Sequence, residues 1–388
     1  MKILKTFIIL MPIIFSFVSC KVNVSKNSND SIPVDTPIPT PDPNPVVTYK
    51  AGDTALTRIK IGSKEYDKTE EVYVTGPEGA TIIGKDNPNN HPGVFIEGRT
   101  VILSPYIMSK YEVTQELYTA VMLGETIVFG ESPITISTPP FYCKEDSSVF
   151  GKNEGEEQRY RPAEGITWYD AVFFCNVLSR KTGLTEAYVI TNKSVNSNSG
   201  HIVDGTIELV EGANGYRLPT EAEWEFAARG GDPTKPDWDY AFSGAQLADG
   251  TSYRDSKNSG LDKVGWYWYN SLNGTTGDLV PSRGSTGYGT HQVGLKAANA
   301  LGIFDMSGNV WEWCYDWTGK IEIDDNVSEP EINPTGAALS ASRVDRGGSW
   351  YYYQDVCAGR CITGHRSSSS PKACDGWHGF RVVRSVVE

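Results

Sequence analysis

The chain has 388 residues, a formal net charge of −13 and a pI near 5.0. This acidic balance argues against a nucleic-acid partner, because phosphate binding needs clustered cations. The five histidines, at positions 91, 201, 291, 365 and 378, are scattered, and no pair has the helical spacing of a zinc hydrolase. Neither nucleic-acid binding nor zinc catalysis is expected.

The N-terminal segment predicts an exported, lipid-anchored chain. Residues 1–20 hold an apolar run from Phe7 to Val18 and end at Cys20. The run is too short to span a bilayer, so it predicts a signal peptide, and its end resembles a bacterial lipobox in which Cys20 becomes the lipidated first residue. The alternative is a signal peptide cleaved elsewhere without a lipid. We expect residues 21–50, rich in Pro, Asn and Ser, to be a tether that presents the domain on the bacterial outer membrane.

Residues 51–388 are long enough for one large domain, and three segments in them predict helices. Each begins at a threonine that can cap it and ends at a glycine: residues 114–124, 167–183 and 220–230. In the third, Thr220 and Glu223 form a capping box. The acidic residues of this helix are interpreted as capping and helix-dipole devices rather than general acids.

Short aromatic or β-branched runs predict strands between glycine-rich connections. These runs are residues 101–103, 264–269 and 379–383. Few strands and long connections predict an irregular α+β domain, in which tryptophans and tyrosines pin the loops.

The C-terminal segment, about residues 346–384, has the composition of a recognition surface. Arg346-Gly347-Gly348-Ser349-Trp350 opens it and Gly379-Phe380-Arg381-Val382 closes it. Tyrosine and tryptophan give rigid contact area, while serine and aspartate give adaptable hydrogen bonds. The alternative, a polar disordered tail, should carry few aromatics.

Two sets of residues follow from this interpretation. We assign ligand contact to Tyr351, Tyr352, Tyr353, Asp355, Ser367, Ser368, Ser369, Ser370, Asp375, Trp377 and His378. We assign scaffold roles to Arg346, Gly347, Gly348, Trp350, Arg366, Gly379, Phe380 and Arg381. Because side chains alternate along a strand, at least one of the three tyrosines should be exposed.

The cysteines suit an exported protein. Cys175 lies in an apolar helix, where a buried free thiol is expected. Cys357, Cys361 and Cys374 fall in the C-terminal segment, so a disulfide that staples this loop is an open alternative.

Five blocks together resemble the formylglycine-generating-enzyme and sulfatase-modifying-factor family. In chain order they are residues 108–114 (MSKYEVT), 165–171 (GITWYDA), 215–225 (GYRLPTEAEWE), 308–313 (GNVWEW) and 346–349 (RGGS). The resemblance implies a C-type-lectin-like fold, with two helices flanking a small twisted antiparallel sheet and extensive loops.

The same resemblance implies a copper-dependent enzyme, but the cysteines of this chain depart from the pattern of that enzyme. The family's enzymes use two cysteines with four residues between them, and such a thiolate pair can hold copper. Cys357 matches the second cysteine, but the first falls on Tyr352. We therefore expect no formylglycine-generating activity, although Cys357 and Cys361 remain open as an offset soft-metal pair.

A calcium site is also suggested by the resemblance. Its ligands would be the Glu312 carboxylate, with Asn309 or the carbonyls of Gly308 and Val310 as further oxygens. The alternative is that Asn309 and Glu312 brace a tight turn between two buried tryptophans. No other cofactor is expected.

The frame of the C-terminal segment resembles the variable proteins of diversity-generating retroelements. In these proteins, adenine-directed mutagenesis rewrites asparagine-type codons, and the products include Tyr, Ser, Asp and His, as at 351–353 and 367–370. The resemblance implies a non-enzymatic, monomeric, lipid-anchored protein that binds an external ligand, which we expect to be a protein. The rivals are a copper-dependent oxidase and a calcium-dependent glycan-binding protein, although the Glu-Pro-Asn and Gln-Pro-Asp triplets of true lectins do not occur.

Overall fold

The computed structural model describes residues 58–76, 81–86, 91–129, 132–143, 155–197, 199–252, 257–272, 288–323, 329–351 and 357–386. The predicted signal peptide, the lipidation site Cys20 and the tether lie outside these residues, as do Tyr352, Tyr353 and Asp355. In the described part, no helix has the length and hydropathy that crossing a bilayer requires.

The three predicted helices are confirmed. They are α1 (Gln115–Met122), α2 (Trp168–Lys181) and α3 (Glu221–Ala228). Thr220 accepts a hydrogen bond from the Glu223 amide while the Glu223 carboxylate accepts one from the Thr220 amide, and Thr167 forms the same box with Asp170. The shorter helices are η2 (Gln158–Tyr160), η3 (Pro236–Asp239), α4 (Leu261–Val264) and α5 (Cys357–Arg360).

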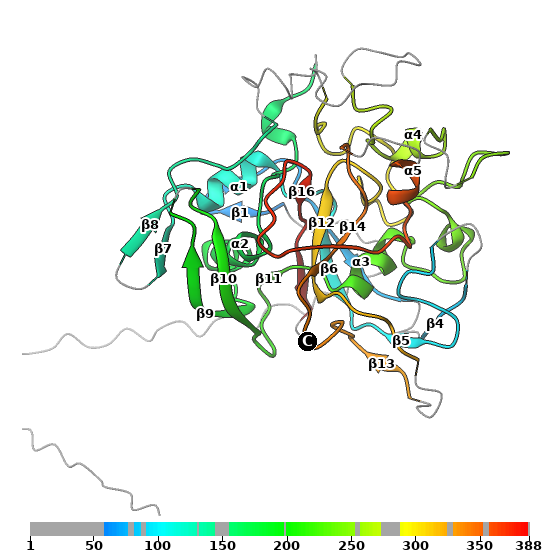
Figure 1. The fold of residues 1–388 in the computed structure, drawn as a ribbon, viewed down its shortest axis with the longest axis horizontal. Helices are drawn as coiled ribbons and strands as arrows, with labels where there is room; N and C mark the ends of the chain where they lie inside the picture. The colour runs from blue at the N-terminus through cyan, green and yellow to red at the C-terminus, as the bar shows by residue number, and fades with distance from the viewer. Residues whose placement is uncertain are drawn as a thin grey trace, which may run out of the picture. The chain divides into compact units, whose positions relative to one another are not determined.

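Two four-stranded sheets occupy the middle of the domain, in the orders β11-β17-β6-β3 and β15-β14-β12-β16. Figure 1 shows α1 and α2 on one side of β12, β14 and β16, and α3 on the other. Strand β16 runs parallel to β12, whereas the other strand pairs of both sheets are antiparallel. The expected antiparallel sheet therefore has one parallel strand at its edge. The strands are β3 (Glu71–Val74), β6 (Tyr106–Ser109), β11 (Tyr216–Arg217), β12 (Trp311–Trp317), β14 (Arg343–Arg346), β15 (Ser367–Ser369), β16 (His378–Gly379) and β17 (Val383–Ser385).

The remaining strands form smaller units at the periphery. A three-stranded sheet has the order β13-β5-β4, and three hairpins pair β1 with β2, β7 with β8 and β9 with β10. Their bounds are β1 (Lys60–Ile61), β2 (Lys64–Glu65), β4 (Ile82–Ile83), β5 (Thr100–Ile102), β7 (Thr126–Phe129), β8 (Ser132–Thr135), β9 (Tyr188–Val195), β10 (Ile202–Leu209) and β13 (Glu331–Ile332).

Two of the three predicted strands differ in the structure. The run 379–383 is divided, because Gly379 ends β16, Val383 begins β17 and residues 380–382 lie between them, and the run 264–269 forms no strand. Residues 264–269 leave α4 and continue as turns. The Tyr267 amide donates to the Asn270 side chain at 2.8 Å, and the Asn270 amide donates back to the Tyr267 carbonyl at 3.0 Å. Tyr267 and the next residue, Trp268, are both buried, which strand alternation on a single buried face would not allow. The aromatic run pins a loop rather than extending a sheet.

A hydrophobic cluster made largely from loops supports the C-terminal segment. Trp268, Tyr288 and Phe242 pack there with Trp350 and with the residues of α5. Tyr351 and Trp377 lie partly buried against this cluster. Aromatic residues therefore pin the loops as expected, and they give the C-terminal segment a rigid base.

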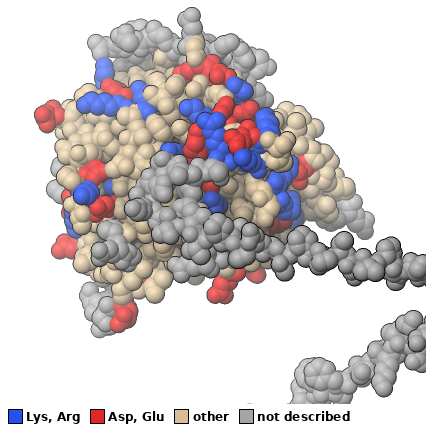
Figure 2. Space-filling view, turned by 180° about the vertical axis from the view of Figure 1, so that it is seen from behind, with Lys and Arg blue, Asp and Glu red and all other residues tan. Residues whose placement is uncertain are grey.

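Charged side chains are mixed on the surface. On the face shown in Figure 2, Lys and Arg side chains lie beside Asp and Glu side chains. Ion pairs among the described residues include Arg180 with Glu186 at 2.7 Å and Lys85 with Asp239 at 2.8 Å. The face in view is not a clustered cationic surface of the kind that binds a phosphate backbone.

Candidate ligand-binding face

The start of the C-terminal segment is fixed by a buried arginine. Arg346, at the end of β14, donates from Nη2 to the Glu225 carboxylate of α3 and, at 3.0 Å, to the Thr363 carbonyl. Arg346 also donates to the His365 carbonyl through Nη1. Both Arg346 and Glu225 have no exposed side-chain surface. The ion pair thus ties the segment to α3, and the two carbonyl contacts tie it to residues 363–365, which precede β15.

The end of the segment is fixed in the same way. Arg381 donates to both oxygens of Glu312 at 2.6 Å, and its guanidinium also reaches the carbonyls of Ser109 and Phe304. Glu312 accepts a third hydrogen bond from Trp224 Nε1 at 2.7 Å. Charged hydrogen bonds inside a buried, fully satisfied network are strong and geometrically specific. Three of the five blocks that carry the family resemblance, residues 108–114, 215–225 and 308–313, therefore meet at this network.

The glycine pair of the frame permits a close backbone approach. Gly348 has φ +76°, and a Cβ built there would lie 2.6 Å from Cys361 Sγ and 2.9 Å from the Arg360 carbonyl. Only a residue without a side chain fits this position next to α5. Gly348 is thus required by the path of the chain into the recognition segment.

Trp350 joins separate parts of the segment. Its side chain is fully buried, its amide donates to the Asn309 carbonyl at 2.9 Å and its Nε1 donates to the Gly376 carbonyl at 3.0 Å. The remaining scaffold residues behave similarly: Phe380 is in the main core, and Arg366 pairs with both oxygens of Glu221 at 2.7 Å. These contacts agree with the scaffold role assigned to them.

Tyr351 and Trp377 form an aromatic platform. Their rings stack at a centroid distance of 4.1 Å with an interplanar angle of 4°. Trp268 meets Tyr351 edge-on at 6.5 Å, and Trp350 does so at 5.2 Å. Both platform residues are half-buried, so each offers part of its surface to solvent on a rigid support. The structure thus brings two distant members of the predicted ligand-contact set together.

The serines lie on an edge strand. β15 pairs with β14, with Ser367 opposite Asp345 and Ser369 opposite Arg343. Ser368 is exposed, whereas Ser367 and Ser369 are half-buried, as alternation predicts. Ser370, just after the strand, is also exposed. Ser368 and Ser370 are the two serines best placed to meet a ligand.

His378 lies elsewhere than predicted. Its side chain is buried at 4% exposure and stacks on Trp313 at 4.8 Å. Its Nε2 lies 3.2 Å from both Ser369 Oγ and Asp345 Oδ2, and its Nδ1 lies 3.7 Å from Asp375 Oδ2. The assignment of His378 to direct ligand contact is corrected by this geometry. The imidazole faces inward because two carboxylates and a tryptophan face hold it under the surface.

The carboxylates control the charge of this histidine. Burial opposes the protonated ring, but hydrogen bonds and attraction from Asp345 and Asp375 outweigh burial and raise the pKa of His378 above its ordinary value. A protonated ring can donate to Asp345 and Ser369 from Nε2 and face Asp375 with Nδ1. His378 therefore braces Ser369 and Asp375, which belong to the predicted contact set, from below.

The raised pKa of His378 predicts a pH dependence of stability. A raised folded-state pKa gives a stabilisation that is present below the unfolded value, about 6.5, and is lost as pH rises through the folded value. We expect the free energy of unfolding, measured by urea titration, to fall as the pH rises from about 6.5 through the raised folded-state pKa, and to fall less in H378Q. His201, whose pKa is raised by Asp170 despite burial, adds to the same trend, so H201Q is the matched comparison. Equal pH slopes for the wild type and H378Q would contradict this reading.

The disulfide left open for the C-terminal segment does not form among Cys357, Cys361 and Cys374. None of the cysteines in the described residues is in a disulfide. Cys357 and Cys361 are buried, and burial raises the pKa of the Cys361 thiol far above its ordinary value. Cys175 is a buried free thiol, which confirms that prediction.

The family's copper ion finds a poor match here. Of the two thiolate positions it needs, this chain has Cys357 and, in place of the other cysteine, Tyr352. Cys361 is the other cysteine that could bind a soft metal together with Cys357. Its burial disfavours the thiolate form that such a metal needs. The residues present do not fit the copper site.

The two side chains among the predicted calcium ligands, Glu312 and Asn309, are engaged with protein groups. Both oxygens of Glu312 are taken by Arg381 and Trp224. The Asn309 amide group donates to Glu112 at 2.7 Å, and its carbonyl oxygen accepts from the His291 amide at 3.0 Å. This arrangement corresponds to the alternative in which Asn309 and Glu312 brace a tight turn.

The carboxylates nearby add little to a cation site. Burial raises the pKa of Asp305 to about 6 and that of Glu112 well above its ordinary value, which makes the charged form of each carboxylate less favourable than in water. One buried oxygen of Asp305 has no hydrogen-bond partner within the described residues. No group of three or more His, Cys, Asp and Glu in those residues is arranged to hold a metal ion. Calcium at this turn stays a prediction that the geometry does not favour.

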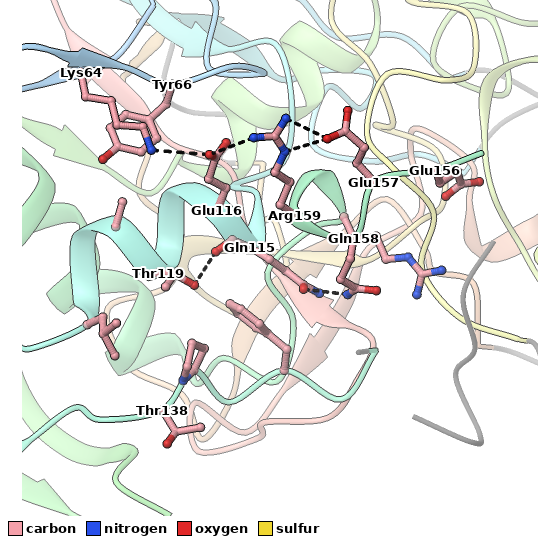
Figure 3. A pocket seen from close by; sticks show the side chains of 15 residues that line it. Lys64, Tyr66, Gln115, Glu116, Thr119, Thr138, Glu156, Glu157, Gln158 and Arg159 are labelled. Carbon is pink, nitrogen blue, oxygen red and sulfur yellow. Dashed lines mark hydrogen bonds and ion pairs between the residues drawn. The ribbon is translucent and has the colours of Figure 1, made fainter. Parts of the chain in front are cut away.

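A cavity of about 1040 Å³ lies outside the predicted contact set. Figure 3 shows Glu116 between Lys64 and Arg159, with ion-pair distances of 3.6 Å to each, and Gln158 donating to Gln115 at 2.8 Å. The charged side chains at its rim thus pair with one another. Its lining comes from β2, α1, η2 and residues 138–141.

The fold and the buried arginine network place the chain in a known class. Residues 59–386 match the sulfatase-modifying factor enzyme 1-like domain, and the chain belongs to this family. The family resemblance stated from the five sequence blocks is confirmed, and so is the α+β fold class with its C-type-lectin-like architecture.

Similar proteins include a formylglycine-generating enzyme, a chaperone protein and a variable protein. The formylglycine-generating enzyme of Thermomonospora curvata is 34% identical over 337 residues, which cover 79% of this chain and 91% of that enzyme. Chaperone protein LppX of Paenibacillus barcinonensis is 36% identical over 257 residues, covering 65% of this chain and 71% of that protein. The solved structure of Treponema denticola variable protein 1 has a TM-score of 0.57 and 30% identity, and the match covers 84% of this chain and 98% of that chain. The resemblance to variable proteins is therefore confirmed at the level of fold and sequence similarity.

Proposed function

We propose that this protein is a non-enzymatic, lipid-anchored surface protein that binds an external protein ligand through a C-terminal face diversified by a retroelement. The observation that carries the proposal is the contrast between Trp350 and Tyr351. Trp350 is buried and hydrogen-bonded to the frame, whereas the next residue opens into a half-exposed aromatic stack. A frame of buried, fixed residues can tolerate exchange of the side chains that stand on it.

The chemistry of the face suits protein recognition. Tyr351 and Trp377 supply rigid apolar area, and the exposed Ser368 and Ser370 and the partly exposed Asp375 supply polar groups from the same segment. Central aromatic anchors surrounded by polar residues are typical of protein–protein interfaces. The match to Treponema denticola variable protein 1 supports the same reading.

The proposal is tested by ligand capture. Peptides selected from a displayed random library for binding to the wild-type chain serve as probes, and their affinity is measured for a variant with alanine at positions 351–353. We expect the affinity to fall at least about tenfold, because buried aromatic anchors dominate binding energy, while the melting temperature changes little. Unchanged affinity, or a collapse of thermal stability, would overturn the assignment.

The copper-dependent oxidase is the alternative, and the identity to formylglycine-generating enzymes favours it. Purified protein with copper and a sulfatase-motif peptide should yield no aldehyde by mass spectrometry if the binding function is correct. Aldehyde formation that disappears in C357S would establish the enzyme instead. Peptide capture that is lost on chelation would instead revive calcium-dependent glycan binding.

A further inference from the structure

A tyrosine from outside the C-terminal segment lies beside the predicted contact residues. Tyr142 follows a proline pair far earlier in the chain and is 48% exposed. A Cβ at Gly165 would lie 3.0 Å from two carbons of its ring, and a Cβ at Gly376 would lie 3.0 Å from Tyr142 Cβ. The ring is therefore seated on two glycines, one of which immediately precedes Trp377.

The backbone under this ring is held rigidly. The amides of Tyr142 and Cys143 donate to the two carboxylate oxygens of Glu164 at 3.0 and 2.7 Å. The Cys143 carbonyl accepts hydrogen bonds from the side-chain amides of Gln115 and Gln158. A large aromatic side chain that stays exposed on such a fixed backbone loses little entropy when it binds a partner.

The surroundings of the Tyr142 ring are negative. The Asp375 carbonyl accepts a hydrogen bond from the Gly165 amide at 3.2 Å, which places this residue next to one of the two glycines under the ring. The Asp375 carboxylate is 47% exposed and also faces His378 Nδ1 at 3.7 Å, so it has a solvent-facing side as well as a buried partner. Burial raises the pKa of Tyr142, and Cys374, Asp375 and Glu164 raise it further.

A carboxylate beside an exposed ring attracts a cation. The ring contributes its negative face and the carboxylate its charge. Lys372, the nearest lysine in sequence, is directed to Asp204 at 3.4 Å. The net charge of −13 attracts basic groups at longer range as well.

We propose that Tyr142 extends the ligand face and, with Asp375, forms a subsite for a guanidinium or ammonium group of the protein ligand. The inference rests on the proposed function and adds a contact from the constant part of the chain. Tyr142 keeps its place when the C-terminal residues change, whereas Asp375 belongs to the segment proposed to vary, so the ring of the subsite is constant and its charge depends on the residue at position 375.

The direct test uses a matched pair of small probes. N-acetyl-arginine amide carries the cation, and N-acetyl-citrulline amide has nearly the same shape without the charge. Saturation-transfer NMR on the full chain should show binding of the arginine probe only. We expect Y142A and D375N each to weaken it by about fivefold, and Y142F to retain it. L339A, which truncates an exposed side chain outside the face, is the control and should bind normally.

The possible results distinguish a failure of the cation subsite from a failure of the proposed ligand-binding function. Equal binding of the arginine and citrulline probes, or full binding by Y142A with an unchanged melting temperature, overturns the cation subsite. If selected peptides still depend on residues 351–353 in that case, the diversified face stands and only the subsite falls. If peptide binding does not depend on residues 351–353 and arginine binding does not depend on Tyr142 and Asp375, both proposals fail.

Discussion

Replacing Arg381 with methionine is expected to lower the free energy of unfolding by about 3–5 kcal/mol. The reason is the Glu312 carboxylate, which would stay buried with only the Trp224 indole as a hydrogen-bond donor. Urea unfolding followed by circular dichroism measures the change. The matched control is R180M, because the Arg180–Glu186 pair is exposed and should contribute less than about 1 kcal/mol.

A double variant makes the Arg381 test more specific. In R381M/E312Q the buried charge is gone, yet the glutamine oxygen can still accept from Trp224. We expect part of the lost stability to return, because the penalty comes from an uncompensated charge rather than from lost packing. If R381M is no more destabilising than R180M, the buried network does not hold the end of the recognition segment.

The second large effect is a difference in the loss of stability between alanine variants of two neighbouring residues, Trp350 and Tyr351. W350A should destabilise by about 3–5 kcal/mol, because it empties a buried site and leaves the Gly376 carbonyl without its donor. Y351A should lower stability by about 1 kcal/mol, the scale of one aromatic pair, and should weaken capture of selected peptides. Parallel urea titrations and peptide affinities measure both quantities.

The W350A and Y351A pair examines the boundary between frame and face. Equal stability losses in the two variants would mean that Tyr351 belongs to the core. Peptide capture that survives in Y351A with unchanged affinity would mean that the stacked ring is not a contact. Either result would move the boundary away from position 350.

A structural feature could be predicted from the sequence where the residues that form it lie within a few positions of one another. Thr220 and Glu223 satisfy each other's amides three residues apart, so a capping box can be identified from the sequence and is found in the structure. The aromatic run at 264–269 shows the limit of such reasoning. β-Branched and aromatic residues favour strands on average, but here Tyr267 and Trp268 are both drawn into a loop core, and that packing overrides the pattern.

The candidate site was predictable only in part. Trp377 and Tyr351 were named from composition, but their stacking joins residues from opposite ends of the segment. Tyr142 carries no signal in the sequence, because what places it beside Asp375 is the absence of side chains at Gly165 and Gly376. His378 was misassigned because its composition suits a contact, whereas Asp345, on another strand, draws its ring inward.

The amino-acid order alone determined the three capped helices, the family frame and the motifs that open and close the C-terminal segment. These depend on periodicity, caps and motifs that lie within a few residues of one another. The tertiary structure decided which side chains of that segment face outward, which carboxylates pair with arginine and which distant tyrosine adjoins the face. Those outcomes arise from burial and hydrogen bonds between residues far apart in the chain, and no local pattern encodes which partner a buried polar group will find.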